Sequence, residues 1–167
     1  MRLPENQIFV FDDVINTESC NELIKIINEE ATQKDEWCPN NNVECYPLAV
    51  GKIKDEVVRK KVDDMIFKII NPICNIFNNR FGIPSSTDVG YTLRKIVGTT
   101  RLHVDGILND RNVKLLNETG IRQMSVIIAL NDDYDGGEFV FPEQNVRIKL
   151  KKGQAVAFPP FWTHPHK

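Results

Sequence analysis

The sequence predicts an α+β fold with a mainly β core, in which helices cover one side of a β-sandwich or barrel. Three observations indicate this. Up to residue 81 the apolar residues recur at helical spacing, whereas from Tyr91 onward they form short runs or alternate with polar residues. Clusters rich in glycine and aspartate separate the short runs, as turns between strands require. Without internal repeats, the 167 residues fit one domain, residues 1–167.

The first part of the chain is predicted to hold one short strand and two helices. The apolar run at residues 8–11 indicates the strand. Asn16 or Thr17 can cap a first helix that ends near Ala31. The apolar positions of this helix lie at helical spacing: Cys20, Leu23, Ile24, Ile26 and Ile27.

Residues 55–81 show helical spacing over a longer stretch and predict the second helix. Pro72 lies inside it and lacks a backbone N–H, so we expect a kink or a new helix start there. Between the two helices, residues 35–43 are polar and rich in asparagine, which predicts a surface loop.

The second part of the chain is predicted to form short β-strands, at residues 91–97, 123–130, 138–141, 146–150 and 154–158. Residues 123–130 are apolar on both faces, as in a buried central strand. Gly136 and Gly137 permit the positive φ angles of a tight turn after it. The stretch of residues 106–120 is long for a loop between strands, so we expect it to form a lid over a functional site.

Composition and charge argue against several classes of function. The formal net charge is −2 and the basic residues are scattered, so the sequence offers no basic surface for nucleic acid. No apolar run approaches the length of a membrane span, and the first residues do not resemble a signal peptide, so a soluble cytoplasmic protein is expected. The four cysteines include no C-x-x-C pair, which argues against a zinc finger.

The three histidines lie in only two places. His103 stands two residues before Asp105, and His164 and His166 stand together near residue 167. Ligands at positions i and i+2 project to the same side of an extended chain. Two imidazoles and one carboxylate form the facial triad that holds Fe(II) and leaves the opposite positions open. The pattern therefore predicts a metal site that joins His103 and Asp105 to one of the two later histidines.

Four motifs follow one another along the chain. They are Phe9-Val10-Phe11-Asp12-Asp13, Arg101-Leu102-His103-Val104-Asp105-Gly106, the run 122–131 followed by Gly136-Gly137-Glu138, and the run 152–159. Together they resemble Fe(II)/2-oxoglutarate-dependent dioxygenases, specifically the prolyl-4-hydroxylase-like branch of microbial and phage type. The resemblance covers nearly the whole chain. It implies a double-stranded β-helix (jelly roll) with N-terminal helices packed on one sheet.

The resemblance also implies which residues are catalytic. His103 and Asp105 match the first two iron ligands. The tryptophan–histidine spacing of microbial and phage sequences favours His166 as the third ligand. The spacing in prolyl hydroxylases instead points to His164, which is the alternative.

The same resemblance implies the reaction and its cofactors. Fe(II) is the metal, 2-oxoglutarate the co-substrate and O2 the oxidant, with ascorbate as an accessory reductant. The reaction is hydroxylation of an unactivated C–H bond, in a prolyl or other residue of a peptide or in a small molecule. The alternative from another class is a non-catalytic jelly-roll module that binds metal or a partner.

One part of the family pattern has no counterpart in the sequence. The family's anchor for the distal carboxylate of 2-oxoglutarate is an arginine or lysine about one strand beyond the third ligand, which places it beyond Lys167. We therefore expect a chain that lacks its last strands and turns over 2-oxoglutarate poorly. Arg94 and Lys95 are the weaker candidates for such a contact within the sequence.

Overall fold

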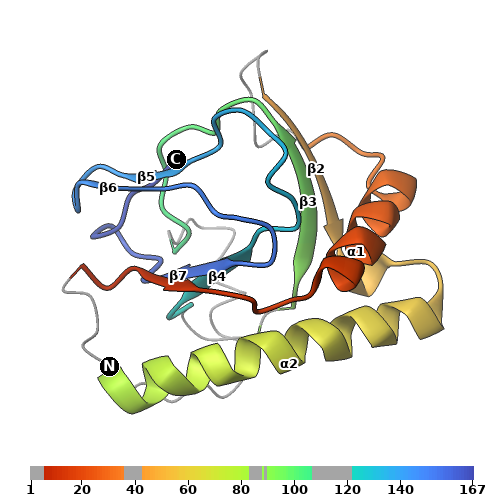
Figure 1. Cartoon of the computed structure of the whole chain (residues 1–167), viewed down its shortest axis with the longest axis horizontal. Helices are drawn as coiled ribbons and strands as arrows, with labels where there is room; N and C mark the ends of the chain where they lie inside the picture. Colours follow the sequence, from red (N-terminus) through yellow and green to blue (C-terminus); the bar gives the residue numbers. More distant parts are fainter. Residues whose placement is uncertain (1–5, 36–42, 83–87, 89, 107–121) are drawn as a thin grey trace, which may run out of the picture.

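The computed structural model describes residues 6–35, 43–82, 88, 90–106 and 122–167. Within them the chain forms helices and short strands (Figure 1). In chain order these are β1 (Phe9–Phe11), α1 (Thr17–Glu30), β2 (Glu44–Ala49), the 3-10 helix η1 (Val50–Lys52), α2 (Glu56–Phe81), β3 (Thr92–Val97), β4 (Ser125–Ile128), β5 (Phe139–Phe141), β6 (Val146–Ile148) and β7 (Ala155–Phe158).

All strand pairs among the described residues are antiparallel, and they form three sheets. One sheet has the order β1-β7-β4, and the other two are the pairs β2-β3 and β5-β6. The α+β class is therefore as predicted. The strands of the described segments do not close into a barrel.

The last residues link two distant parts of the chain through main-chain hydrogen bonds. The N–H of His103 donates to the carbonyl of His166 at 2.9 Å, and the N–H of His166 donates to the carbonyl of His103 at 2.8 Å. Val140 of β5 and Lys167 exchange a second such pair, at 2.9 and 3.1 Å. Residues 166–167 therefore run between the His103 segment and β5, as Figure 1 shows.

β7 is fully buried, and its alternating side chains separate two layers of the core. Ala155 and Ala157 pack in the cluster that includes Phe77 of α2. Val156 and Phe158 belong to a different cluster, on the opposite face of the strand. The small alanines let the helix approach the sheet closely, while the larger side chains fill the space toward β5 and β6.

Both α-helices begin at side-chain caps, which satisfy N–H groups that lack a partner within the helix. Asn16 accepts the N–H of Ser19 at 2.8 Å at the start of α1. Asp55 accepts the N–H groups of Val57 and Val58 at 2.8 and 3.0 Å at the start of α2. The predicted cap and extent of the first helix are confirmed.

α2 continues through Pro72 and does not restart there. Pro72 lies on the exposed side of the helix. The carbonyl of Lys68, which loses its partner to the proline ring, can therefore bond to water instead. Burial of Ile73 and Phe77 on the opposite side holds the second half of the helix against the sheet.

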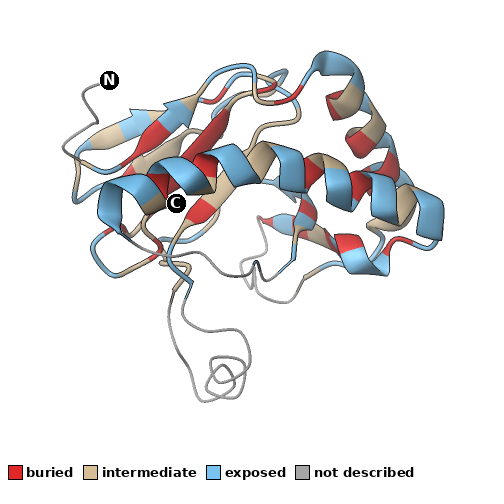
Figure 2. Ribbon diagram, turned by 90° about the horizontal axis from the view of Figure 1, so that it is seen from below, coloured by how far each residue is buried: buried red, intermediate tan, exposed pale blue. Residues whose placement is uncertain are grey.

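The helices pack on two of the described sheets: α1 lies against β2 and β3, and α2 lies against these strands and the β1-β7-β4 sheet. α2 runs along the β1-β7-β4 sheet (Figure 1), and its outer side is exposed along most of its length (Figure 2). A second core cluster joins α1, the first half of α2, β2 and β3. Its members include Cys20, Leu23, Leu48, Val62 and Leu93.

Two strands differ from the sequence prediction. β2 was not predicted, although Cys45 and Leu48 within it are buried. Pro47 interrupts the strand pattern of β2, and a proline without an N–H is tolerated here because β2 pairs only with β3 among the described strands. The predicted central strand, β4, lies at the edge of its described sheet, and β7 lies in the middle.

Most of two predicted loops cannot be compared with the structure. Residues 36–42 of the surface loop and residues 107–120 of the lid lie outside the described residues. Among the helices of the described part, none is both long enough and apolar enough to cross a membrane.

Gly136 and Gly137 adopt the positive φ angles that the sequence predicts, 67° and 71°. They do not form a tight turn between paired strands, because β4 ends at Ile128 and β4 and β5 belong to different sheets. A β-carbon on Gly137 would lie 2.5 Å from the ring of Tyr134. We expect Gly137→Val to lower the free energy of unfolding by about 1–3 kcal/mol, because both the φ angle and the ring oppose a side chain.

Thermal unfolding measures this effect, with Gly51→Ala as the control. A β-carbon on Gly51 meets nothing within 4 Å. An unchanged melting temperature for Gly137→Val would contradict the proposed strain.

Candidate metal centre

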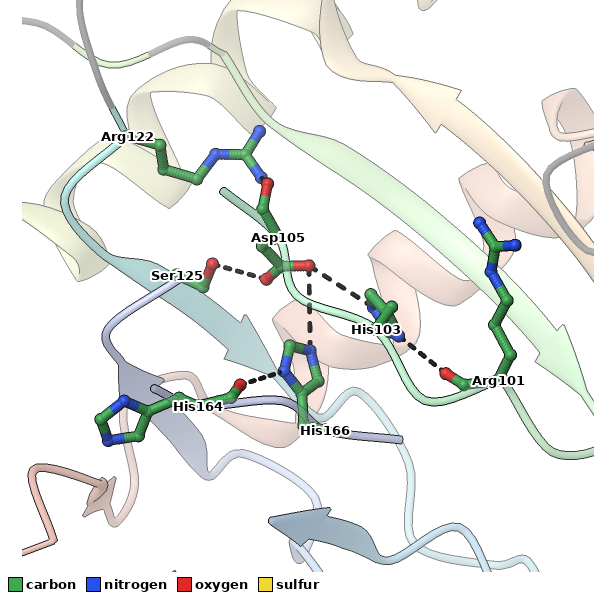
Figure 3. Close-up of polar contacts among 7 residues, drawn as sticks. All are labelled: Arg101, His103, Asp105, Arg122, Ser125, His164 and His166. Atoms are coloured by element: carbon green, nitrogen blue, oxygen red, sulfur yellow. Dashed lines mark hydrogen bonds and ion pairs between the residues drawn. The ribbon is translucent and has the colours of Figure 1, made fainter. Parts of the chain in front are cut away.

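Three side chains from two distant segments meet beside the bridge between His103 and His166 (Figure 3). His103 and Asp105 come from the extended segment after β3, and His166 reaches them from the last residues. The Oδ1 atom of Asp105 lies 3.5 Å from Nε2 of His103 and 3.8 Å from Nε2 of His166. One ligand atom from each residue lies within 4.8 Å of the others.

Each of the two imidazoles is held by a carbonyl of its own segment. Nδ1 of His103 donates to the carbonyl of Arg101 at 2.8 Å, and Nδ1 of His166 donates to the carbonyl of His164 at 3.1 Å. A carbonyl oxygen can only accept, so the proton of the neutral ring sits on Nδ1. When both rings are neutral, as a metal ligand must be, both Nε2 atoms present a lone pair toward Asp105. When the ring of His103 is protonated, its Nε2–H instead donates to Asp105.

Asp105 is held from the start of β4. The hydroxyl of Ser125 donates to Oδ2 of Asp105 at 2.5 Å. Arg122 donates from its guanidinium to the main-chain carbonyl of Asp105 at 3.2 Å. The next residue, Gly106, donates its N–H to the carbonyl of Pro160 at 2.8 Å. The carboxylate and its main chain are therefore both restrained.

Burial and nearby charges shift the pKa of all three groups. Burial raises the pKa of Asp105, but hydrogen bonds from His103 and Ser125 and the two nearby imidazoles outweigh it and lower the pKa to about 2. The hydrogen bond to Asp105 raises the pKa of His103, against the effect of burial. Burial lowers the pKa of His166. An ionised carboxylate therefore faces a buried imidazole that favours its neutral form, and metal ligands need both states.

His166 lies against an apolar wall. Its side chain is buried, and its ring centroid lies 4.7 Å from that of Phe158 and 5.5 Å from that of Phe141. Both phenylalanines are themselves fully buried. This side of the site is therefore shielded from water, which strengthens interactions between the charged groups in it.

His164 is not part of the cluster, and its ring points away from Asp105 in Figure 3. Both ring nitrogens of His164 already have partners. Nε2 lies 3.0 Å from the carbonyl of Asn6, and Nδ1 lies 2.8 Å from the hydroxyl of Thr163. His164 is buried, and its contact with the carbonyl of Asn6 ties the last segment to the residues before β1.

The two weaker candidates, Arg94 and Lys95, are exposed on β3, where they pair with Pro47 and Tyr46 of β2. Neither belongs to the His103, Asp105 and His166 cluster. Ser125 and Arg122 were not predicted as site residues. The only sequence signal for them is their place just before or within a predicted strand, and serine and arginine are common in such positions. Only the fold brings them to Asp105.

The donor set fits a divalent transition metal. Two neutral imidazoles and one carboxylate oxygen converge, and the second atom of each group is already hydrogen-bonded. This is the ligand set of the 2-His-1-carboxylate facial triad. Fixed outer partners of this kind orient the ligands and set their tautomers.

No protein-family profile matches the chain. The chain is 25% identical over 193 residues to prolyl 3-hydroxylase 1 of Rattus norvegicus, an alignment that covers 96% of the chain and 26% of the rat protein. It is 23% identical over 167 residues to a protein of Acanthamoeba polyphaga mimivirus provisionally named a prolyl 4-hydroxylase, covering 98% of the chain and 65% of the viral protein. Both of these relatives are named as prolyl hydroxylases. The chain thus spans about a quarter of the rat protein's length.

Solved structures show the same fold. The collagen prolyl hydroxylase of Paramecium bursaria Chlorella virus-1, solved with 2-oxoglutarate, superposes with a TM-score of 0.65 at 19% identity, over 96% of this chain and 86% of that one. A Pseudomonas putida prolyl-4-hydroxylase gives a TM-score of 0.51 at 14% identity, over 96% and 83%. The resemblance to the prolyl-4-hydroxylase-like branch is confirmed.

We expect His103→Ala and His166→Ala to lower the affinity for Mn(II), a redox-stable substitute for Fe(II), by on the order of 100-fold or more. Loss of an outer partner alone costs about 10–100-fold, and loss of a ligand costs at least as much. His164→Gln should keep wild-type affinity and lose thermal stability, because its ring bonds only to Asn6 and Thr163.

Calorimetric titration and thermal unfolding of the three variants measure these effects. Equal Mn(II) affinity in wild type and His103→Ala would sink the metal assignment. A loss of affinity in His164→Gln that exceeds the loss in His166→Ala would make His164 the third ligand.

Proposed function

We propose that the protein is an Fe(II)- and 2-oxoglutarate-dependent dioxygenase that hydroxylates a prolyl residue of a peptide. The convergence of His103, Asp105 and His166 carries this proposal, because it supplies a facial triad in a fold shared with prolyl hydroxylases. Homology to prolyl hydroxylases supports the oxidoreductase class.

In this proposal the two imidazoles and the Oδ1 atom of Asp105 hold the iron. Bound Fe(II) would supply the activation of O2, with 2-oxoglutarate as the co-substrate that is decarboxylated to succinate. The protein contributes the orientation of the ligands through the carbonyls of Arg101 and His164. Phe141 and Phe158 exclude water from one side of the site.

We further propose that the β-structure is a jelly roll. The pairing of His103 with His166, and of Lys167 with Val140, extends the β5-β6 pair toward the triad. A shared apolar cluster, which includes Phe141 of β5 and Val156 of β7, lies between this extended sheet and the β1-β7-β4 sheet. A metal site carried by one sheet and backed by the other is the arrangement that such a fold provides.

The substrate is proposed to dock beside Trp162, whose side chain is 81% exposed. The loop that carries it is held at Pro160, which accepts from Gly106 next to Asp105, and at Thr163, which accepts from Gln144 at 2.6 Å. A large aromatic ring exposed on a loop whose main chain is anchored on both sides suits a recognition surface. Flat aromatic rings also suit proline-rich extended segments.

The decisive test is succinate formation from 2-oxoglutarate with Fe(II), O2 and a proline-rich peptide. We expect slow but peptide-dependent turnover in the wild type. In Asp105→Ala the turnover should fall by about 1000-fold or more, because one of three ligands and the only anion among them is lost. Mass spectrometry of the peptide should show one added oxygen atom per hydroxylated proline.

The control is the same assay with a peptide in which alanine replaces each proline. Metal binding without succinate formation under any of these conditions would favour the non-catalytic module. Turnover with both peptides would support the dioxygenase and contradict the prolyl substrate.

We expect Trp162→Ala to raise the KM for the peptide by on the order of tenfold and to leave Mn(II) affinity unchanged, because buried aromatic contacts dominate recognition surfaces. Phe67→Ala is the matched control, since Phe67 is also an exposed aromatic residue, 52% exposed on α2. An unchanged KM in Trp162→Ala would exclude this tryptophan from substrate binding.

A further inference from the structure

We propose that Ser125 is a positioning residue that restricts Asp105 to binding metal through one oxygen. This inference rests on the proposed function, since it concerns the same metal. It would explain how the metal keeps enough free coordination positions for both the co-substrate and O2. The two carboxylate oxygens of Asp105 have different partners.

The two oxygens of Asp105 have separate environments (Figure 3). Oδ1 faces Nε2 of both His103 and His166, at 3.5 and 3.8 Å. Oδ2 accepts the hydroxyl hydrogen of Ser125 at 2.5 Å. A short bond to a charged acceptor is among the stronger hydrogen bonds in proteins. Rotation of the carboxylate to bring both oxygens to the metal would break it.

Ser125 is well placed to impose this restraint. It is the first residue of β4, paired with Phe158 of β7, and its side chain is 7% exposed. Phe158 in turn packs edge-on against the ring of His166. The hydroxyl is therefore delivered by a strand that contacts another part of the same site. Water has little access to replace it.

The main chain of Asp105 is restrained independently of Ser125. Arg122 donates to its carbonyl, and the neighbouring Gly106 donates to Pro160. A β-carbon on Gly106 would lie 2.9 Å from that Pro160 carbonyl, so the two segments are in close contact. With the main chain held, the main remaining freedom is rotation of the carboxylate, which the Ser125 bond opposes.

The restraint on Asp105 would determine how many coordination positions of the metal remain free. A facial triad occupies one face of a metal and leaves the opposite positions free. A two-pronged co-substrate and O2 together need all of that opposite face. If Asp105 bound through both oxygens, it would take one of those positions. Ser125 is therefore expected to govern the number of open positions more than the strength of metal binding.

The test counts the water molecules on bound Mn(II), through the relaxation rate of bulk water protons in the metal-loaded full chain without co-substrate. We expect Ser125→Ala to lower this rate by about one third, because a second carboxylate oxygen would replace one of roughly three waters opposite a facial triad. Ser125→Thr keeps the hydroxyl and should retain the wild-type rate.

Ser125→Cys is the second variant, in case removal of the side chain disturbs β4. Cysteine has nearly the same size but is a weak donor, so it should behave like Ser125→Ala. Melting temperatures of the metal-free variants report purely structural effects, which would not change the water count.

Wild-type relaxation rates in both Ser125→Ala and Ser125→Cys, with Mn(II) bound, would overturn the inference and leave the proposed function intact. Absence of Mn(II) binding in the wild type itself would overturn both. A reduced rate in Ser125→Thr equal to that in Ser125→Ala would also contradict a role for the hydroxyl.

Discussion

β7 lies buried between β1 and β4, and its side chains contact three distant parts of the molecule. Its alternating small and large side chains let α2 approach one face and fill the core on the other. Phe158, the last residue of the strand, also contacts the ring of His166 and pairs with Ser125. The packing of one strand therefore joins the helical layer, the apolar core and the candidate site.

The site itself combines local and distant interactions. Each imidazole is oriented by the carbonyl two residues before it, that of Arg101 for His103 and that of His164 for His166. These contacts need only an extended segment. The carboxylate of Asp105 instead depends on Ser125, which lies 20 residues away in sequence and reaches it only through the folded sheet. Orientation of the carboxylate is thus the property of the site most sensitive to the tertiary fold.

The predictable parts of the molecule are those with a short-range physical signal. Both helices and most strands follow from the spacing of their apolar residues, and the pair His103 and Asp105 follows from a two-residue spacing on an extended chain. β2 was missed because Pro47 breaks its pattern. β4 was predicted to be the central strand, but β7 occupies the middle of the described sheet. An apolar run does not reveal the order of strands in a sheet. That His166 and not His164 lies beside Asp105 could likewise not be predicted from spacing, because it depends on the positions of Asn6 and Thr163 in the fold.

The His164-Pro-His166 segment shows how two similar residues acquire different tasks. Two histidines two apart on an extended chain are expected to share a face, yet their rings point in different directions. His164 bonds through its ring to Asn6 and Thr163, while its carbonyl holds the ring of His166. His164 therefore serves the site through its main chain, and its side chain fixes that main chain in place. Replacing its side chain is expected to lower thermal stability by loosening this segment, and not to remove a metal ligand, so stability and metal affinity have to be measured separately.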